Sequence, residues 1–449
     1  MEQSVRPAAP SSRPVSDVSG AVGLVGIAGL AVWILICRNW PGIVDLLGLP
    51  GPHARLSGPY AALAALAFSS IPMVIWSVVV DKVHRNPSTG IDWGNVRPQS
   101  ETIDISITKL AGLWATWALI GFLYCVGRWY WRGQYVFAME VIGAAAVPAF
   151  LLSIPYVLWL DRRMVNPRDA SWHFGAMLIG REPYDLEQVW KHLRIWAVKG
   201  FFTAFMVSIL PWSFTNLVEL DPATIARQPA AMANALINAM FFFDVQIGAV
   251  GYIMTFKPVD AHIRSANPFL AGWLAALLCY PPFVVMSSQA LSYEVNTADW
   301  SHWMQGHIAL QWVWCALLTF LTGVYASATV IFGLRFSNLT YRGVVTTGPY
   351  RFTRHPAYLS KNLFWWCSSL PFLVTSHSLT DAIRNTFFIL VTNAIYFWRA
   401  KTEEKHLLAE DPKYREYHAW MAENALITRS FRKIAALARP RGPRLQPAE

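Results

Sequence analysis

The sequence predicts an all-α, polytopic integral membrane protein with about ten transmembrane helices and both termini in the cytoplasm. Of its 449 residues, 54% are hydrophobic and only 14% are charged, whereas about a quarter of the residues in soluble proteins are charged. Apolar stretches of roughly 18 to 25 residues recur along the whole chain, and each can cross about 30 Å of hydrocarbon as a helix. This composition excludes a large soluble enzyme.

The first span, at residues 20–37, follows Arg6 and Arg13 as the core of a signal peptide would. However, its apolar run is longer than a typical signal core, and the bulky residues 37–40 (CRNW) lack a small-residue cleavage pattern. We therefore expect a membrane anchor. Further spans are expected at residues 59–80, 109–126, 137–160, 196–217, 233–255, 268–288, 309–334, 362–377 and 382–399.

The positive charges predict the orientation. The net charge is +10, with 37 Lys and Arg residues, and with ten spans roughly 30 of them fall on the side of the N-terminus, which is the positive-inside pattern. The basic surplus is thereby explained by topology and by contact with anionic lipid head groups, and no nucleic-acid site is required. The opposite side receives Arg38, Arg55, Arg128, Arg132, Arg227 and Arg384.

We divide the chain into a polar tail (1–18), an N-terminal transmembrane region of unknown role (19–300), a C-terminal membrane domain (301–435) and a basic Pro-rich tail (436–449). The N-terminal region contains an internal similarity. The sequence DK at 81–82, followed by NP at 86–87, resembles DR at 161–162, followed by NP at 166–167. This suggests an internal repeat, in which each copy either stops a helix beside a snorkelling cation or forms a polar vestibule for a lipid head group.

A few residues inside the spans require an interpretation of their own. Gly20, Gly23, Gly26 and Gly29 predict close packing of the first helix rather than a phosphate loop. Lys199 lies near a span end and can snorkel. Asp244 lies deeper, where charge is costly, and indicates an internal polar contact or part of a substrate cavity. The five cysteines predict neither a disulfide framework nor a metal site.

The chemistry is concentrated near the C-terminus. A short polar stretch, GPYRFTRHPAY at 348–358, leads into the ninth span, and a connector at 376–384 predicts a helical hairpin. The tenth span runs out into WRAKTEE at 398–404, where helical spacing places Arg399 and Glu403 on one face. Tyr414 and Tyr417 follow on a charged, amphipathic stretch that we expect to lie on the membrane.

This ordered set resembles the isoprenylcysteine carboxyl methyltransferases and their phospholipid methyltransferase relatives, over roughly the last quarter of the chain. The resemblance implies that 301–435 is a methyltransferase-like domain that binds S-adenosyl-L-methionine at its cytoplasmic mouth, and that Arg399 and Glu404 serve catalysis. The cofactor-binding residues implied by the resemblance are Gly348, Tyr350, Arg354, His355, Tyr358 and Glu403.

These residue types suit the cofactor, because its carboxylate, ammonium, sulfonium and adenine require cations, carboxylates and aromatic surface together. A carboxylate acceptor needs no general base, and a guanidinium can orient it. We therefore expect Arg399 to position the acceptor, with Glu404 holding Arg399 or the cofactor amine. The sequence favours carboxyl O-methylation of an isoprenylcysteine-like group on a membrane lipid or lipidated substrate, and it indicates no oligomeric state.

Other interpretations stay open at this point. A phospholipid N-methyltransferase would use the same cofactor. A sterol-reductase-like enzyme that uses NADPH would also have about ten spans, but its expected pattern RHxNYxGD is replaced by RHPAYLSK at 354–361. The chain could also be a transporter or scaffold with a vestigial site. Finally, Arg399 and Glu403 could form an ordinary surface ion pair, which would contribute less than about 1 kcal/mol.

Overall fold

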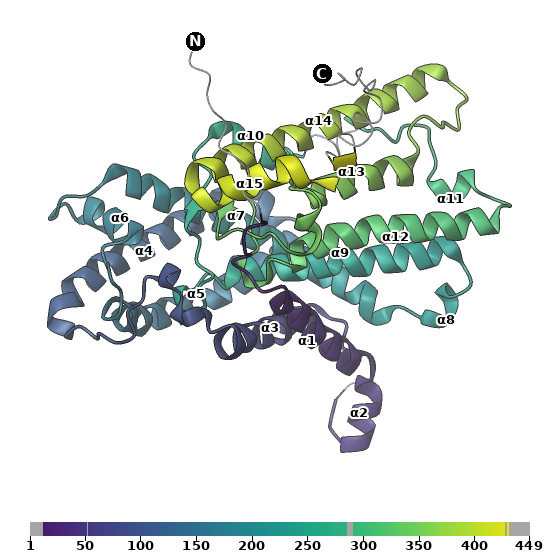
Figure 1. Cartoon of the computed structure of the whole chain (residues 1–449). Helices are drawn as coiled ribbons and strands as arrows, with labels where there is room; N and C mark the ends of the chain where they lie inside the picture. Colours follow the sequence, from purple (N-terminus) through teal and green to yellow (C-terminus); the bar gives the residue numbers. More distant parts are fainter. Residues whose placement is uncertain (1–11, 52, 285–290, 427–428, 431–449) are drawn as a thin grey trace, which may run out of the picture.

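The computed structural model describes residues 12–51, 53–284, 291–426 and 429–430, and long helices dominate it (Figure 1). The predicted tail 436–449 lies outside these residues. The long helices are α1 (Gly20–Arg38), α3 (Pro59–Ile75), α4 (Gln99–Val126), α5 (Tyr135–Asp161), α7 (Leu186–Glu219), α9 (Pro229–Ile253), α12 (Ile308–Val330) and α14 (Leu379–Glu410). The shorter helices are α2 (Trp40–Leu47), α6 (Ala170–Ile179), α8 (Pro222–Ile225), α10 (Leu270–Leu277), α11 (Trp300–Trp303), α13 (Pro356–Ser369) and α15 (Pro412–Asn424). Two short strands, β1 (Ser265–Ala266) and β2 (Thr340–Tyr341), form an antiparallel pair.

Seven helices in the described part of the chain are long and apolar enough to cross a membrane. They are α1, α3 extended to Val80 by a π-helical turn, α4, α5, α7, α9 and α12. These helices confirm the integral membrane class and seven of the predicted spans.

The other three predicted spans differ from the helices observed. The span at 268–288 corresponds to α10, which has 8 residues, and its last residues lie outside the described ranges. The span at 362–377 corresponds to α13, whose 14 residues give a helix only about 21 Å long. The span at 382–399 lies within the more polar α14, which has 32 residues. The total of ten spans and the cytoplasmic location of the termini therefore stay predictions.

The glycine run of α1 packs closely against other helices, as the sequence predicts. A Cβ atom at Gly26 would collide with the Met73 side chain, and one at Gly29 would collide with the backbone oxygen of Phe68, both on α3. A Cβ atom at Gly23 would meet the backbone oxygen of Val330 at the end of α12. Hence α1 bridges the N-terminal helices and α12.

The two similar segments of the N-terminal region lie against each other. The backbone N–H of Asp92 donates to the carbonyl of Arg163 (2.7 Å), and that of Val165 donates to Gly90 (3.0 Å). Asp161 is fully buried, and the Lys109 ammonium lies 2.5 Å from its carboxylate. In this copy of the repeat the acidic residue is therefore an internal ion-pair partner. A duplication origin stays a prediction.

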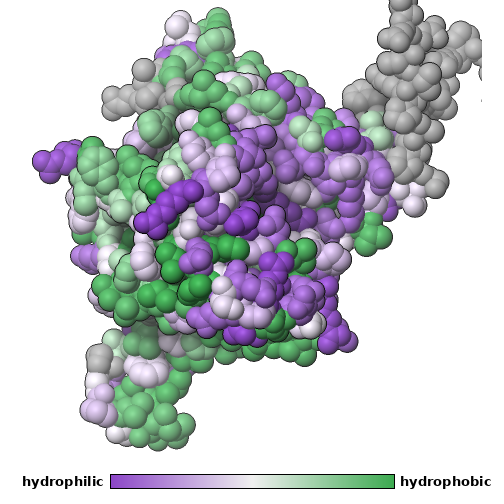
Figure 2. Space-filling view, turned by 90° about the vertical axis from the view of Figure 1, so that its left-hand side faces the viewer, coloured by the Kyte–Doolittle hydropathy of each residue, from purple (hydrophilic) through white to green (hydrophobic). Residues whose placement is uncertain are grey.

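The N-terminal segment and α15 lie on the same side of the molecule. Asp17 pairs with Lys413, and it accepts a hydrogen bond from the backbone N–H of Val344 (2.7 Å). The Arg13 guanidinium lies 5.9 Å from the centre of the Trp420 ring. Figure 2 views one end of the molecule, where hydrophilic residues gather in the centre and hydrophobic residues lie along the left edge and below.

Candidate active site

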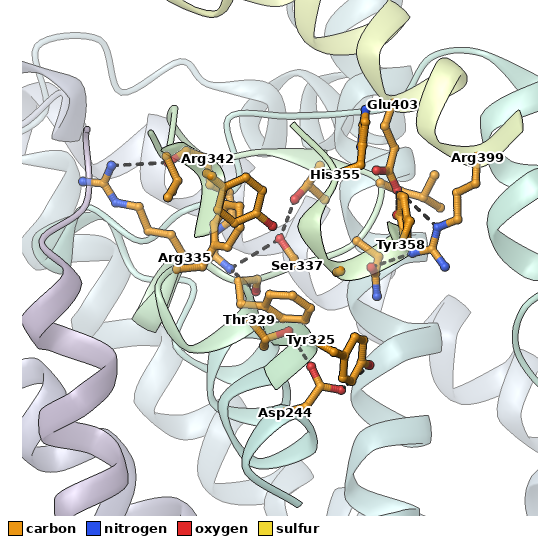
Figure 3. Close-up of a pocket in the computed structure, with 18 of the residues that line it drawn as sticks. Asp244, Tyr325, Thr329, Arg335, Ser337, Arg342, His355, Tyr358, Arg399 and Glu403 are labelled. Atoms are coloured by element: carbon orange, nitrogen blue, oxygen red, sulfur yellow. Dashed lines mark hydrogen bonds and ion pairs between the residues drawn. The ribbon is translucent and has the colours of Figure 1, made fainter. Parts of the chain in front are cut away.

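A cavity of about 380 Å³ lies between α7, α9, α12, α13 and α14. Its size is within the range of small-molecule pockets. In Figure 3, Glu403 lies at one end of the cavity, Tyr358 and Arg399 lie in the middle, and Asp244 lies at the other end. We call the Glu403 end the mouth and the Asp244 end the deep end.

The predicted motif at 348–358 folds over the mouth because its glycine and prolines fix two turns. Gly348 adopts φ +57°, a conformation that favours glycine, and Pro356 is the first residue of α13, where a missing N–H costs nothing. Between these turns, Tyr350, Arg354 and His355 reach the cavity wall. Gly348 itself does not line the cavity, since the residue it packs against is Ile331. It shapes the loop.

Arg399 lies on the cavity wall and is only 3% exposed. Its Nε lies 3.2 Å from Glu403, and its Nη2 donates to the Asn338 side chain at 2.7 Å. The guanidinium also lies 5.2 Å from the Tyr358 ring centre and 5.4 Å from that of Tyr280. The pair therefore joins a buried arginine to a partly buried glutamate, whose side chain is 22% exposed, and the interpretation as an ordinary surface pair is wrong.

Glu403 connects Arg399 to the loop motif. The Tyr358 hydroxyl donates to Glu403 at 2.5 Å, and the His355 ring stacks on Tyr358 with centroids 5.7 Å apart and an interplanar angle of 12°. Four residues that are separated in the sequence therefore meet at one place. A carboxylate, two cationic or ionisable groups and an aromatic face are presented together.

Glu404, the next residue along α14, points to a different partner set and does not line the cavity. Its carboxylate accepts hydrogen bonds from Arg354 (2.7 Å), His355 (3.0 Å) and Lys401 (2.8 Å). Burial raises the pKa of Glu404, but the hydrogen bonds, including one from His418, and the Arg354 charge outweigh it and hold the pKa well below its ordinary value. Glu404 thus fixes the Arg354 and His355 side chains of the motif.

Tyr414 and Tyr417 on α15 cover the mouth of the cavity. Both are buried and line the cavity, and the Tyr417 hydroxyl donates to the backbone oxygen of Tyr350 at 2.6 Å. They pack with Tyr341 and Val344. The sequence predicted that this stretch lies on the membrane. It did not predict the contacts with the rest of the protein that bury the two tyrosines.

The deep end combines apolar walls with a polar cluster. Asp244 on α9 accepts hydrogen bonds from the hydroxyls of Tyr325 (2.6 Å) and Thr329 on α12. The interpretation of Asp244 as an internal polar contact is therefore confirmed. Asp244 also lines the cavity, and a role in binding a substrate stays a prediction. Lys199 lies elsewhere, with its ammonium 3.8 Å from the Trp196 ring centre.

The sequence did not identify several residues of this cavity, among them Tyr280, Tyr325, Asn338 and Lys361. Of these, only Lys361 had a usable signal, because it follows Tyr358 by three residues on the same helix and therefore shares its face. His406 also lines the cavity, and burial, followed by the Arg194 charge, lowers its pKa to about 4. Within the described ranges, no group of His, Cys, Asp or Glu could hold a metal ion.

The mouth fits S-adenosylmethionine by the chemistry of its side chains. Glu403 offers a carboxylate to an ammonium or sulfonium, and Arg354 with His355 offers donors to a carboxylate. The rings of Tyr350 and Tyr358 offer flat surfaces to adenine or to a cation. All of these groups line one cavity.

The fold and the cavity together define a helical integral membrane protein with a cavity of small-molecule size beside its C-terminal helices. Residues 309–409 match the model of the isoprenylcysteine carboxyl methyltransferase (ICMT) family, which confirms the resemblance for this part of the chain. The matched segment contains α12, α13 and most of α14, whereas α7, α9 and α15 lie outside it. No curated protein and no solved structure matches the chain.

Proposed function

We propose that this chain is an integral membrane methyltransferase that depends on S-adenosyl-L-methionine and methylates the carboxylate of a lipophilic, isoprenylcysteine-like acceptor. The observation that carries the proposal is Arg399, a buried guanidinium on the cavity wall within the segment that matches the family. Hydrogen bonds to Glu403 and Asn338 and two tyrosine rings fix its position. An immobile guanidinium can orient a carboxylate in one geometry.

The mouth residues would hold the cofactor. Glu403 would bind its cationic groups, Arg354 and His355 would bind its carboxylate, and Tyr350 and Tyr358 would lie against its flat or cationic parts. When bound, S-adenosylmethionine supplies a methyl group on a positively charged sulfur. Tyr414 and Tyr417 would exclude water from the mouth, since both are buried above it.

The transfer itself needs alignment more than proton chemistry. An acceptor carboxylate oxygen forms a bond to the methyl carbon while the sulfur–methyl bond breaks, and the electron pair of that bond stays on sulfur. An anion and a sulfonium cation give a neutral ester and S-adenosylhomocysteine, so no proton moves and no general base is required. Arg399 would therefore orient the carboxylate toward the methyl group, which lowers the activation barrier of the transfer.

Glu404 takes part indirectly in this proposal. It is a positioning residue, because it touches Arg354 and His355 rather than the cavity. We further propose that the acceptor enters from the bilayer, and that the mouth faces the cytoplasm, where anionic lipid head groups would contact the basic loops.

The test uses the full-length protein in lipid nanodiscs. We expect it to bind S-adenosylhomocysteine in calorimetry and to transfer labelled methyl groups to an S-prenylated N-acetylcysteine. Arg399→Ala should lower kcat/KM by about 100-fold, a typical loss for a group that acts in the transition state. The control is Arg181→Ala, an exposed arginine that does not line the cavity. Unchanged turnover in Arg399→Ala would contradict the proposal.

The alternatives give different outcomes in the same assays. A phospholipid N-methyltransferase would label phosphatidylethanolamine and leave the prenylated acid unlabelled; the acidic Asp244 in the deep end is the feature that favours an amine. A reductase-like enzyme would be stabilised against heat by NADPH and not by S-adenosylhomocysteine. A transporter or scaffold with a vestigial site would bind neither cofactor.

A further inference from the structure

We infer that Lys361 is a second anchor for the acceptor carboxylate, and that α7 and α9 of the N-terminal region build the pocket for the acceptor's apolar chain. This inference rests on the proposed function and makes its acceptor site specific. The sequence assigned no site role to Lys361, and α7 and α9 lie outside the matched residues 309–409.

Among the described residues that line the cavity, Lys361 is the Lys or Arg residue that forms neither an ion pair nor a hydrogen bond with a protein group. Its ammonium is surrounded by three rings, with centroids at 5.1 Å (Tyr325), 5.3 Å (Trp365) and 5.6 Å (Tyr396). In the described part of the chain, no carboxylate forms an ion pair with it. A charged ammonium among apolar groups is costly unless an anion accompanies it. A ligand can supply that anion.

The arginines of the wall each have a protein partner. Arg399 pairs with Glu403, Arg354 pairs with Glu404, and Arg335 pairs with Asp260. The remaining arginine, Arg342, donates to backbone carbonyls at the end of α9 and in neighbouring loops. Lys361 therefore differs from these arginines, since no described protein group pairs with it or accepts a hydrogen bond from it.

Asp244, the acidic residue of the deep end, acts on Lys361 by its charge, but among the described residues the two form no ion pair. Its two oxygens accept hydrogen bonds from Tyr325 and Thr329. Tyr325 contacts both residues, since its hydroxyl donates to Asp244 and its ring face lies beside Lys361. An acceptor carboxylate that approaches Lys361 would replace the missing partner, whereas an amine acceptor would be repelled by it.

Lys361 and Arg399 converge on one region of the cavity. Lys361 lies one helical turn after Tyr358 on α13. The Arg399 guanidinium lies over the ring of Tyr358. Tyr396, one turn before Arg399 on α14, forms part of the ring cluster around Lys361. A carboxylate between the two cations would lie beside the mouth residues that are proposed to hold the cofactor.

The apolar part of the acceptor has its own wall. Phe205, Met206 and Ile209 of α7 and Phe241 and Val245 of α9 line the cavity. Burying a hydrocarbon chain here would contribute about 0.8 kcal/mol per methylene group. The cavity therefore offers two cations at one place and an apolar wall beside them, which is the complement of a lipophilic carboxylic acid.

The experiment compares an acid with its neutral analogue. S-farnesyl-N-acetylcysteine and the corresponding carboxamide are titrated against full-length protein in nanodiscs, with and without S-adenosylhomocysteine, and binding is followed by tryptophan fluorescence. The variants are Lys361→Met, which keeps the length without the charge, and Lys361→Arg, which keeps the charge. Lys405→Met is the matched control, because Lys405 is exposed and does not line the cavity.

We expect the wild-type protein to bind the acid more tightly than the carboxamide. Lys361→Met should weaken acid binding by at least about 10-fold, as expected when a charged partner is removed, and should bind the carboxamide as the wild type does. Lys361→Arg should restore the preference for the acid. In turnover assays Lys361→Met should raise the KM for the acid far more than it lowers kcat, with the affinity for S-adenosylhomocysteine within about two-fold of wild type.

Three results would overturn the inference. They are an equal affinity of the wild type for acid and carboxamide, unchanged acid binding in Lys361→Met, and an equal loss of both probes in that variant. The proposed function fails separately, by absence of S-adenosylhomocysteine binding or of methyl transfer. The titrations without cofactor still decide the role of Lys361 in that case.

Discussion

Replacing Glu404 by glutamine should weaken cofactor binding by about 30-fold. Glu404 is 4% exposed, and its carboxylate accepts hydrogen bonds from Arg354 at 2.7 Å and His355 at 3.0 Å. A hydrogen bond to a charged group contributes about 1.5 to 3 kcal/mol, and a glutamine at this position would keep one acceptor but lose the charge. The hydrogen bond from Lys401 contributes little to this energy, because the Lys401 side chain is 50% exposed. About 2 kcal/mol would therefore be lost from holding Arg354 and His355 in place for the cofactor, which corresponds to about 30-fold in affinity.

The assay is titration calorimetry with S-adenosylhomocysteine on nanodisc-embedded protein. Glu416→Gln, an exposed residue of α15, is the control and should bind as the wild type does. An affinity of Glu404→Gln within two-fold of wild type would refute the positioning role. If the variant loses affinity but Arg354→Gln does not, the loss cannot act through Arg354.

The same variant gives a pH test with a defined sign. Because the folded-state pKa of Glu404 lies well below its ordinary value of 4.5, its stabilisation is fully present above that value and is lost as the pH falls further. Between pH 6 and 8 the wild type should exceed Glu404→Gln in unfolding free energy by a constant amount. Below about pH 4.5 the difference should shrink, as followed by thermal unfolding. A difference that grows on acidification would contradict the assignment.

Two further predictions concern the N-terminal region. Gly29→Ala should lower the free energy of unfolding by about 1 to 3 kcal/mol, because the added methyl group would collide with the backbone of Phe68. The control is Gly42→Ala, which should leave the stability unchanged because no atom lies within 4 Å of the added methyl group. Equal thermal unfolding of the two variants would contradict this prediction. Lys109→Met should lower the free energy of unfolding by about 3 to 5 kcal/mol, because it leaves the buried Asp161 charge without its closest partner. The double variant with Asp161→Asn should recover part of this loss in the same measurement.

The sequence predicted the parts of this protein that depend on local order. Seven spans followed from uninterrupted apolar runs, because a helix in lipid must satisfy its own backbone. The glycine run of α1 followed from residue size. The C-terminal hairpin was only partly predicted, since α13 ends at Ser369, and the next residue, Leu370, adopts a left-handed conformation and precedes Pro371. Hydropathy does not register such a stop.

Helix geometry explains why Glu403 and Glu404 contact different partners, although both follow Arg399 closely in the sequence. Successive residues of an α-helix point about 100° apart, so only Glu403, four residues after Arg399, shares its face. Glu404 turns toward the loop that carries Arg354 and His355. The sequence could give the spacing, but the partner of Glu404 depends on where the loop folds.

The deep end of the cavity could not be predicted for a different reason. Phe205, Met206 and Phe241 are ordinary apolar residues of membrane helices, and only the packing of α7 and α9 beside α12 brings them to the cavity. The matched family segment supplies Arg399, Glu403 and the loop motif, which suit any acceptor of the cofactor's methyl group. The apolar wall proposed to select the acceptor comes from outside that segment. On this proposal, differences in acceptor among chains that share the C-terminal motif would arise from the helices packed against it, and the parts of α7 and α9 that line the cavity would belong to the active site.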